Sequence, residues 1–328
     1  MQSFFPFLVV IVALYSASAF LMGRLVAAGG LRMDVPNARS SHTSQKPRGG
    51  GVVFVLMISV TWLFLSGFFA ISGQGILPGS ARVALSGEQW MALIAGFAVL
   101  GLTGAADDRK GLAARTRFTV QVAVALGVVA SGLRWRELDL GFTTLELSSG
   151  GSILISVLWI VWSTNLFNFM DGIDGIAGLT GVVIATATAV LAWLFSCGDL
   201  VVASIVMVPC IAAFLRFNLV ESRIFMGDAG SLPLGFGFSV FMLVLHNTSG
   251  SRFALWHGAL VCCPFLADAT FTLVQRAIRG ERFWLAHCDH VYQKLSRRVG
   301  SHRAVAVGYA LVGAFSAALA ITNVIGKR

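Results

Sequence analysis

Long apolar runs and short polar segments alternate along almost the whole chain. Each run covers about 16–22 residues, close to the length of a helix that crosses the hydrocarbon core of a bilayer. The apolar residues are consecutive rather than alternating, which favours helices over the strands of a membrane barrel. We therefore predict an all-α polytopic membrane protein, one integral membrane domain over 1–328 with about ten transmembrane helices. The predicted spans are 4–22, 50–71, 89–106, 118–133, 151–168, 176–196, 200–216, 232–247, 253–274 and 304–322.

The composition supports this class. Of the 328 residues, 56% are hydrophobic and only 12% are charged, whereas charged residues make up roughly a quarter of an average soluble domain.

The first apolar run, 4–22, resembles a signal peptide with a cleavage site at Ala17-Ser18-Ala19, but no basic segment precedes it and Arg24 follows it. We predict a retained first span with its N-terminus outside. The segment 133–150 partly alternates and predicts a small hairpin on the outer face.

The basic residues are divided unevenly between the two sides that these spans define. One set of connections holds 18 of the 24 Lys and Arg residues and the other set holds 6. Cytoplasmic connections carry such an excess, so the net charge of +9 is attributed to topology and no nucleic-acid partner is predicted. The set predicted to be cytoplasmic comprises 24–49, 107–117, 216–231 and 275–303.

Acidic residues gather on this same side. Asp107 and Asp108 end one span, and as adjacent carboxylates they favour a nearby cation or a shared proton. With the basic residues of 109–117, they suit a metal-bound polyphosphate; the alternative is a solvated loop that only sets topology. In 165–178, NLFNFMDGIDGIAG, Asn168, Asp171 and Asp174 recur every three residues. They share a face if the stretch is helical, unless one Asp simply caps the next helix.

Three further segments on this side carry candidate residues. In 223–235, RIFMGDAGSLPLG, Asp228 is either a metal ligand or a helix cap, and Phe225 a stacking surface for a base. The segment 275–303 holds seven basic residues with His287 and His290, and is either a phosphate-binding loop or an interfacial helix on anionic lipid. The polar loop 29–51 either sets topology or lines an entrance, with Asp34, Arg39, His42, Lys46 and Arg48 as its candidate residues. Asp268 lies inside an apolar run, and its role is left open.

Five strings in the chain resemble a known family, the polyprenyl-phosphate N-acetylhexosamine-1-phosphate transferases. They extend over about residues 30–300 and read DVPNARSSH…PRGGG, DDRKGLAARTRFTVQ, NLFNFMDGIDGIAG, FMGDAGS and HCDHVYQKL. The chain looks closest to the WbpL-like branch that starts O-antigen or other surface-polysaccharide synthesis. The peptidoglycan branch carries a run of histidines where this chain has His287-Cys-Asp-His290, which weakens any role carried over to the second histidine of that run.

The resemblance implies a reaction. A UDP-N-acetylhexosamine (UDP-GlcNAc, or a 6-deoxy sugar such as UDP-FucNAc or UDP-QuiNAc) binds at the cytoplasmic face of a bacterial inner membrane. Undecaprenyl phosphate enters from the bilayer and attacks the β-phosphorus, which gives the lipid diphosphate sugar and UMP. The family implies Mg²⁺, with Mn²⁺ as a substitute, and a homodimer. Two alternatives from other classes are a transporter and a non-catalytic lipid-phosphate-binding protein.

The resemblance also implies roles for individual residues. Asp228 and Asn168 would bind the metal, and Asp107 would be the base that keeps the lipid phosphate ionised. Asp108 would assist the metal or orient a basic neighbour. The remaining roles are the nucleotide side of the site for Asp171 and Asp174, stacking on uracil for Phe225, and substrate binding for Arg48, Arg117 and His290.

Overall fold

The computed structural model describes residues 4–29, 31–34, 45–72, 83–139, 143–250, 252–281 and 288–326. Most of these residues are helical. The helices are α1 (Phe4–Ala28), α2 (Gly51–Ser72), α3 (Gly87–Lys110), α4 (Ala114–Ala130), α5 (Ser149–Phe169), α6 (Ile176–Leu194), α7 (Gly198–Ile205), α8 (Met207–Leu215), the π-helix η1 (Arg216–Val220), α9 (Asp228–Thr248), α10 (Leu255–Val261), α11 (Cys263–Ile278), α12 (Val291–Val299) and α13 (His302–Gly326). Two short antiparallel pairs of strands are β1 (Met33–Asp34) with β2 (Lys46–Pro47), and β3 (Glu137–Asp139) with β4 (Thr144–Glu146).

The all-α polytopic class is confirmed. Within the described ranges, eight helices are long and apolar enough to cross a membrane, and the bent pair α10–α11 makes a ninth. Helix α4 has 17 residues, which is about 26 Å at the rise of an α-helix and slightly less than the roughly 30 Å of a hydrocarbon core.

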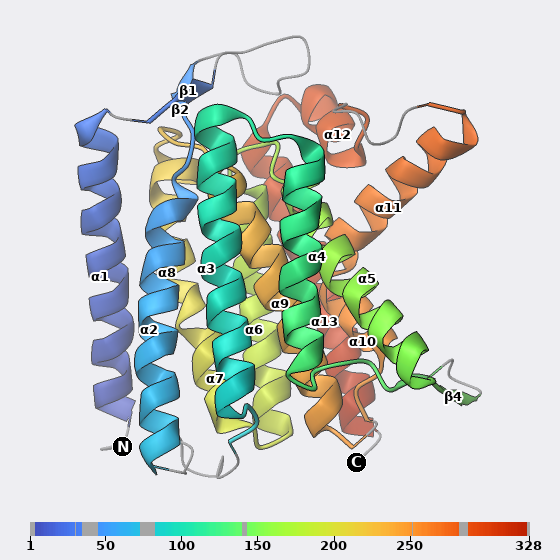
Figure 1. Ribbon diagram of the computed structural model, residues 1–328. Helices are drawn as coiled ribbons and strands as arrows, with labels where there is room; N and C mark the ends of the chain where they lie inside the picture. The colour runs from blue at the N-terminus through green and yellow to red at the C-terminus, as the bar shows by residue number, and fades with distance from the viewer. Residues whose placement is uncertain are drawn as a thin grey trace.

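One predicted span is sharply bent, whereas the span 200–216 is divided into α7 and α8 without a bend of that size. The run 253–274 divides into α10 and α11, whose axes differ by 96° on either side of Cys262. Pro264 lies in the first turn of α11, and proline has no N–H with which to continue a preceding helix. Helix α11 therefore leaves the bundle at a steep angle (Figure 1).

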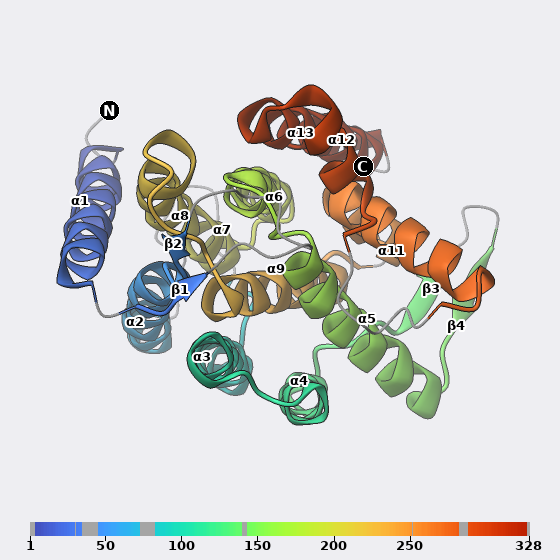
Figure 2. The same ribbon diagram turned by 90° about the horizontal axis from the view of Figure 1, so that it is seen from above.

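Helix α9 lies at the centre of the bundle, with α2, α3, α5 and α6 packed around it (Figure 2). Every residue from Asp228 to His246 is buried. A helix that is apolar on all sides belongs inside a bundle, and its small residues Gly230, Gly235 and Gly237 let neighbouring helices approach closely. The one acid on this helix, Asp228, is its first residue, so the polar chemistry lies at the end of the central helix.

The connections are arranged in two groups (Figure 1). The strands β1 and β2, the turn between α3 and α4, and helix α12 lie at one end of the bundle. The hairpin β3–β4 lies at the other end, where it confirms the predicted hairpin in 133–150, with Leu138 opposite Leu145. The segment 216–231 reaches this end too, because Phe225 pairs with Arg48 next to β2. All segments predicted to be cytoplasmic thus have described parts at the same end. Which side of the membrane that end faces stays a prediction.

Candidate active site

The amino end of α9 is built together with the carboxyl end of α3. The first N–H groups of any helix have no partner within the helix. Here the Asp108 carboxylate accepts hydrogen bonds from the backbone N–H groups of Asp228 and Ala229, both at 3.1 Å. Asp108 is only 7% exposed. The interpretation of Asp228 as the helix cap is therefore wrong, because Asp108 caps α9 and leaves the Asp228 side chain to other partners.

Two arginines from distant parts of the chain bridge the carboxylates. Arg48 Nε lies 3.1 Å from Asp108 Oδ1, and Arg48 Nη2 lies 3.3 Å from Asp228 Oδ1. Arg117 Nη1 lies 2.8 Å from Asp107 Oδ2 and 3.0 Å from Asp228 Oδ2. Each oxygen of Asp228 thus faces a guanidinium. We call these five residues the ion cluster. Asp107 and Asp108 were expected to attract a cation, and the cations beside them are Arg117 and Arg48.

A polar cavity of about 370 Å³ opens beside the ion cluster. It is lined by Arg32, Met33, Asp34, Arg48, Asp107, Asp108 and Gly111. Arginine donors beside a polar cavity suit an anionic ligand, because a guanidinium binds phosphate oxygens through two parallel hydrogen bonds. Of the predicted entrance residues, Asp34 and Arg48 line this cavity, whereas Arg39 and His42 lie outside the described residues.

The stretch 165–178 is not a single helix, so Asn168, Asp171 and Asp174 do not share one helix face. Helix α5 ends at Phe169 and α6 begins at Ile176. Gly175 has a φ of +84°, a left-handed conformation that glycine adopts without steric cost, and it separates the two helices. Asn168 consequently lies in the last turn of α5, and Asp171 and Asp174 lie in the connection.

Asn168 and Asp171 face the amino end of α9. Asn168 Nδ2 donates to Ser231 Oγ at 2.9 Å, one turn into α9 from Asp228. Burial raises the pKa of the Asp171 carboxyl well above its ordinary value; the positive charge of Arg48 opposes this shift and the neighbouring acid Asp228 adds to it. An acid with a raised pKa beside other acids is typical of a functional site.

Asp174 belongs to a second polar group. Lys46 Nζ and Ser222 Oγ both donate to Asp174 Oδ2, at 2.7 and 2.6 Å. Burial alone would raise the pKa of Asp174, but hydrogen bonds from His302, Lys46 and Ser222 outweigh burial, and the pKa is lowered. The interpretation of either Asp in this connection as a cap is wrong, because α6 follows Gly175 and has no side-chain cap.

Phe225 lies against the segment that precedes α2. Its N–H donates to the Pro47 carbonyl at 2.9 Å, and its carbonyl accepts from the N–H groups of Gly49 and Gly50 at 3.2 and 2.9 Å. The Lys46 ammonium lies 4.9 Å from the centroid of the Phe225 ring. These backbone bonds hold Arg48 at the level of the amino end of α9. Stacking of Phe225 on uracil stays a prediction.

His290 approaches the end of α5. Its Nδ1 lies 3.6 Å from Asp268 Oδ1, and its ring stacks on Phe169 with centroids 6.4 Å apart. Tyr292 donates its O–H to the Phe169 carbonyl at 3.1 Å. The structure thus brings His290 next to the helix end that carries Asn168. The second histidine, His287, lies outside the described residues.

Two partners of these groups, Ser231 and Ser222, are not among the predicted site residues. Ser231 follows Asp228 by three residues, and this spacing on a helix could have indicated that the two are neighbours. Ser222 lies in no recognisable pattern. Its pairing with Asp174 depends on two connections that only the fold brings together.

Fold and site together define a class: a polytopic membrane protein with a polar site at one end, where buried acids and arginines meet. Residues 90–246 match the family described as Glycosyl transferase family 4. The chain belongs to this family.

Three bacterial relatives cover most of the chain. It is 30% identical over 316 residues to a decaprenyl-phosphate N-acetylglucosaminephosphotransferase of Mycobacterium tuberculosis, which covers 87% of this chain and 75% of the relative. It is 27% identical over 284 residues to a probable undecaprenyl-phosphate N-acetylglucosaminyl 1-phosphate transferase of Bacillus subtilis, covering 86% and 74%. It is 27% identical over 327 residues to an undecaprenyl-phosphate alpha-N-acetylglucosaminyl 1-phosphate transferase of Yersinia pestis, covering 96% and 82%.

Proposed function

We propose that the protein transfers N-acetylhexosamine-1-phosphate from a UDP-sugar to undecaprenyl phosphate and releases UMP. The observation that carries this proposal is the ion cluster, in which Arg48 and Arg117 share the Asp228 carboxylate at the end of a membrane helix. Two guanidinium groups at the membrane boundary suit a reaction between two phosphorylated substrates, one soluble and one lipid. The names of the relatives support this reaction for the family.

The side chains act chiefly by positioning and by charge. Asp108 orients Arg48, and Asp107 orients Arg117, through the contacts described above. The guanidinium groups neutralise charge as an oxygen of the lipid phosphate forms a bond to the β-phosphorus and the bond to the α–β bridging oxygen breaks. A phosphate monoester has a second pKa near 6, so it is already ionised at neutral pH. Asp107 therefore contributes more by holding Arg117 than by removing a proton.

The oxygen donors at the amino end of α9 fit a magnesium ion. No three His, Cys, Asp or Glu residues in the described ranges lie close enough to bind one cation by themselves. Mg²⁺ usually binds through one or two protein oxygens and completes its shell with phosphate oxygens and water. Asp228 and Asn168 would supply the protein oxygens. When bound, the ion would offset the repulsion between the two anionic substrates.

We assign the polyprenyl chain of the lipid acceptor to an apolar groove on the side of the bundle. It has a volume of about 460 Å³ and lies between α4 and α5. Phe118, Leu158 and Trp162 line it and are exposed. Phe118 directly follows Arg117 on α4, so one end of the groove lies at the level of an arginine of the ion cluster. This arrangement supports lateral entry of the polyprenyl chain.

We place the UDP-sugar donor among the connecting segments at the end of the bundle that carries the ion cluster. We assign the nucleotide of the donor to the region of Phe225 and Asp174, and we assign contact with its phosphates to His290. Asp171 would lie between the nucleotide and the phosphates. The names of the relatives favour N-acetylglucosamine as the sugar, and the 6-deoxy donors UDP-FucNAc and UDP-QuiNAc are the alternatives. With any of these sugars the product would start an O-antigen or other surface glycan.

Purified protein tests the proposed reaction directly. UMP release from UDP-GlcNAc, or from one of the 6-deoxy donors, is expected only when undecaprenyl phosphate and Mg²⁺ are both present. Excess EDTA should lower the rate by at least about 100-fold, since a metal at transferring phosphates contributes several kcal/mol. Restoring Mg²⁺ or Mn²⁺ should restore the rate. Turnover without the lipid or without metal, or none with any UDP-N-acetylhexosamine, contradicts the proposal.

The proposed cytoplasmic location of the site can be tested on one helix. Glu88 and Lys110 lie near opposite ends of α3, and both side chains are exposed. Single cysteines at these positions, in a background without the native cysteines, should be labelled from opposite sides in oriented membrane vesicles. We expect Lys110→Cys to react from the cytoplasmic side. Labelling of Lys110→Cys from the outside would place the site on the wrong face for a UDP-sugar.

A further inference from the structure

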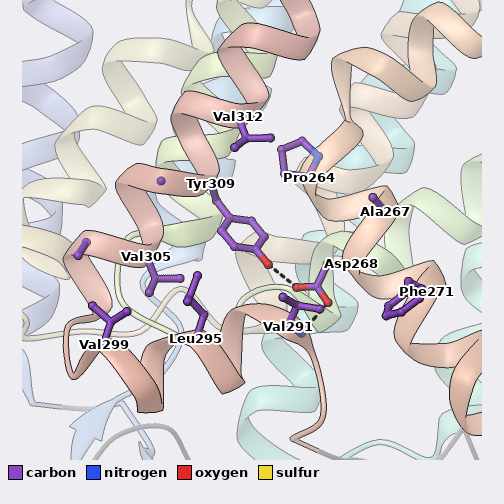
Figure 3. Close-up of a pocket in the computed structure, with 12 residues that line it drawn as sticks. Pro264, Ala267, Asp268, Phe271, Val291, Leu295, Val299, Val305, Tyr309 and Val312 are labelled. Carbon is purple, nitrogen blue, oxygen red and sulfur yellow. Dashed lines mark hydrogen bonds between the residues drawn. The ribbon is translucent and has the colours of Figure 1, made fainter.

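A buried acid outside the ion cluster joins three helices. Asp268 lies on α11 and is 6% exposed. Its carboxylate accepts hydrogen bonds from the backbone N–H groups of Val291 and Tyr292, at 2.8 and 2.9 Å. It also accepts the Tyr309 O–H at 2.6 Å, from α13. Figure 3 shows this carboxylate between Tyr309 and Val291, at the edge of an apolar pocket.

Two of these hydrogen bonds come from the start of α12. Val291 and Tyr292 are the first two residues of this helix, whose leading N–H groups have no partner inside it. A carboxylate satisfies two of them and also interacts favourably with the positive end of the helix dipole. An acid inside a membrane protein is costly to bury. Besides the hydrogen bond from Thr272 Oγ1 within α11, this carboxylate accepts three from neighbouring helices, which indicates a specific requirement.

The first turn of α12 connects Asp268 to the candidate active site. His290, the residue before α12, has its Nδ1 3.6 Å from Asp268 Oδ1 and its ring on Phe169. The Tyr292 hydroxyl bonds the Phe169 carbonyl and lies 2.0 Å from where a Cβ on Gly172 would be. Both aromatic residues therefore pack against the end of α5 and the connection that carries Asp171.

We propose that Asp268 is a positioning residue, which holds the first turn of α12 so that His290 and Tyr292 are kept against the α5–α6 connection. Asp268 does not itself touch substrate. Asp268 affects turnover through His290. Any test that measures activity therefore rests on the proposed transferase function.

A double-mutant cycle tests this dependence. Asp268→Asn keeps the shape of the side chain but places an amide N–H against one of the two α12 donors, and is expected to lower kcat about tenfold or more. In a His290→Ala background the same change should lower kcat less than twofold, because residues that act through one another are not additive. If the two effects multiply instead, Asp268 does not act through His290.

Asp199 supplies a matched control. It is fully buried near the far end of the bundle and accepts the backbone N–H groups of Ala84 and Leu85 at 2.9 and 2.8 Å. Asp199→Asn thus makes the same chemical change and should leave kcat within twofold, whatever it does to stability. Tyr309→Phe removes one bond to Asp268 but keeps both bonds to α12, and should also leave kcat within threefold.

Amide hydrogen exchange provides a readout that does not need activity. Asp268→Asn should speed exchange in peptides covering 288–299, whereas Asp199→Asn should do so around 83–90. Unchanged exchange in 288–299 overturns the proposal even if turnover falls. If wild-type protein releases no UMP, the proposed function fails while the exchange arm still tests Asp268. Should Asp268→Asn fail to fold, Asp268→Glu, which moves the carboxylate by one methylene, takes its place with the same expected outcomes.

Discussion

Replacing Asp228 with Asn is expected to abolish turnover, by about 1,000-fold or more in UMP release. In the native chain each carboxylate oxygen faces a different guanidinium, Arg48 at 3.3 Å and Arg117 at 3.0 Å. An amide has one acceptor oxygen and would direct N–H groups at the other cation. The loss combines a misplaced arginine with a weakened ligand for the proposed metal, and removing a single preorganised charge-stabilising group commonly costs 100- to 1,000-fold.

The fold should tolerate this change. The Arg48 and Arg117 side chains are 42% and 32% exposed, so water can solvate the charges that Asp228 releases. A control with the same local chemistry is Glu221, which pairs with Arg216 and Arg223 at 3.2 and 3.3 Å and is not in the ion cluster. Glu221→Gln should retain turnover within threefold. Folded Asp228→Asn protein with comparable turnover would refute the role of this carboxylate.

Gly104→Ala should cause a large loss of stability. Gly104 is on α3, where a Cβ would lie 2.2 Å from the Asp228 carbonyl oxygen and 2.5 Å from the Ala229 nitrogen. These are backbone atoms of the central helix, so no side chain can move aside. The two helices would have to separate at the point where Asp108 caps α9. Overpacking costs roughly 1–3 kcal/mol when side chains can adjust, and here we expect about 3 kcal/mol or more.

Thermal unfolding in detergent measures the loss of stability. UMP release from the protein that remains folded measures whether the separation of α3 and α9 also lowers turnover. Gly127 on α4 is the matched control, since it is also a helix glycine but a Cβ there would have nothing within 4 Å. Gly127→Ala should be neutral or stabilising by up to about 1 kcal/mol, as alanine is the better helix former. Equal unfolding temperatures for the two variants would show that α3 and α9 are not in this close contact.

The pattern of apolar runs was sufficient to predict the helical membrane class. The physical reason is that lipid offers no hydrogen bonds, so an apolar run of sufficient length must satisfy its own backbone groups as a helix. The same pattern could not predict the bend at Cys262, because a run of apolar residues has the same length whether its helix is straight or broken. Pro264 was a visible signal for that break.

The sequence also identified most of the residues that meet at the site. Asp107, Asp108 and Asp228 were found because acids at the ends of apolar runs are costly unless they have a use. Their individual contacts were not predictable in the same way. Asp108 and Asp228 were both open to interpretation as metal ligands or structural acids. Only the packing of α3 on α9 brings Asp108 to the start of α9, where it caps the helix that begins at Asp228.

What the sequence by itself determined is therefore the helical class, the division of polar groups between the two ends of the bundle, and the acids and arginines gathered at one of them. Only the tertiary structure decided which charges pair. Lys46 bonds Asp174 across 128 positions, and Asp108 bonds the backbone of Asp228 across 120. Hydrogen bonds act over about 3 Å, so partners this far apart in the chain are chosen by the packing of helices and not by local spacing.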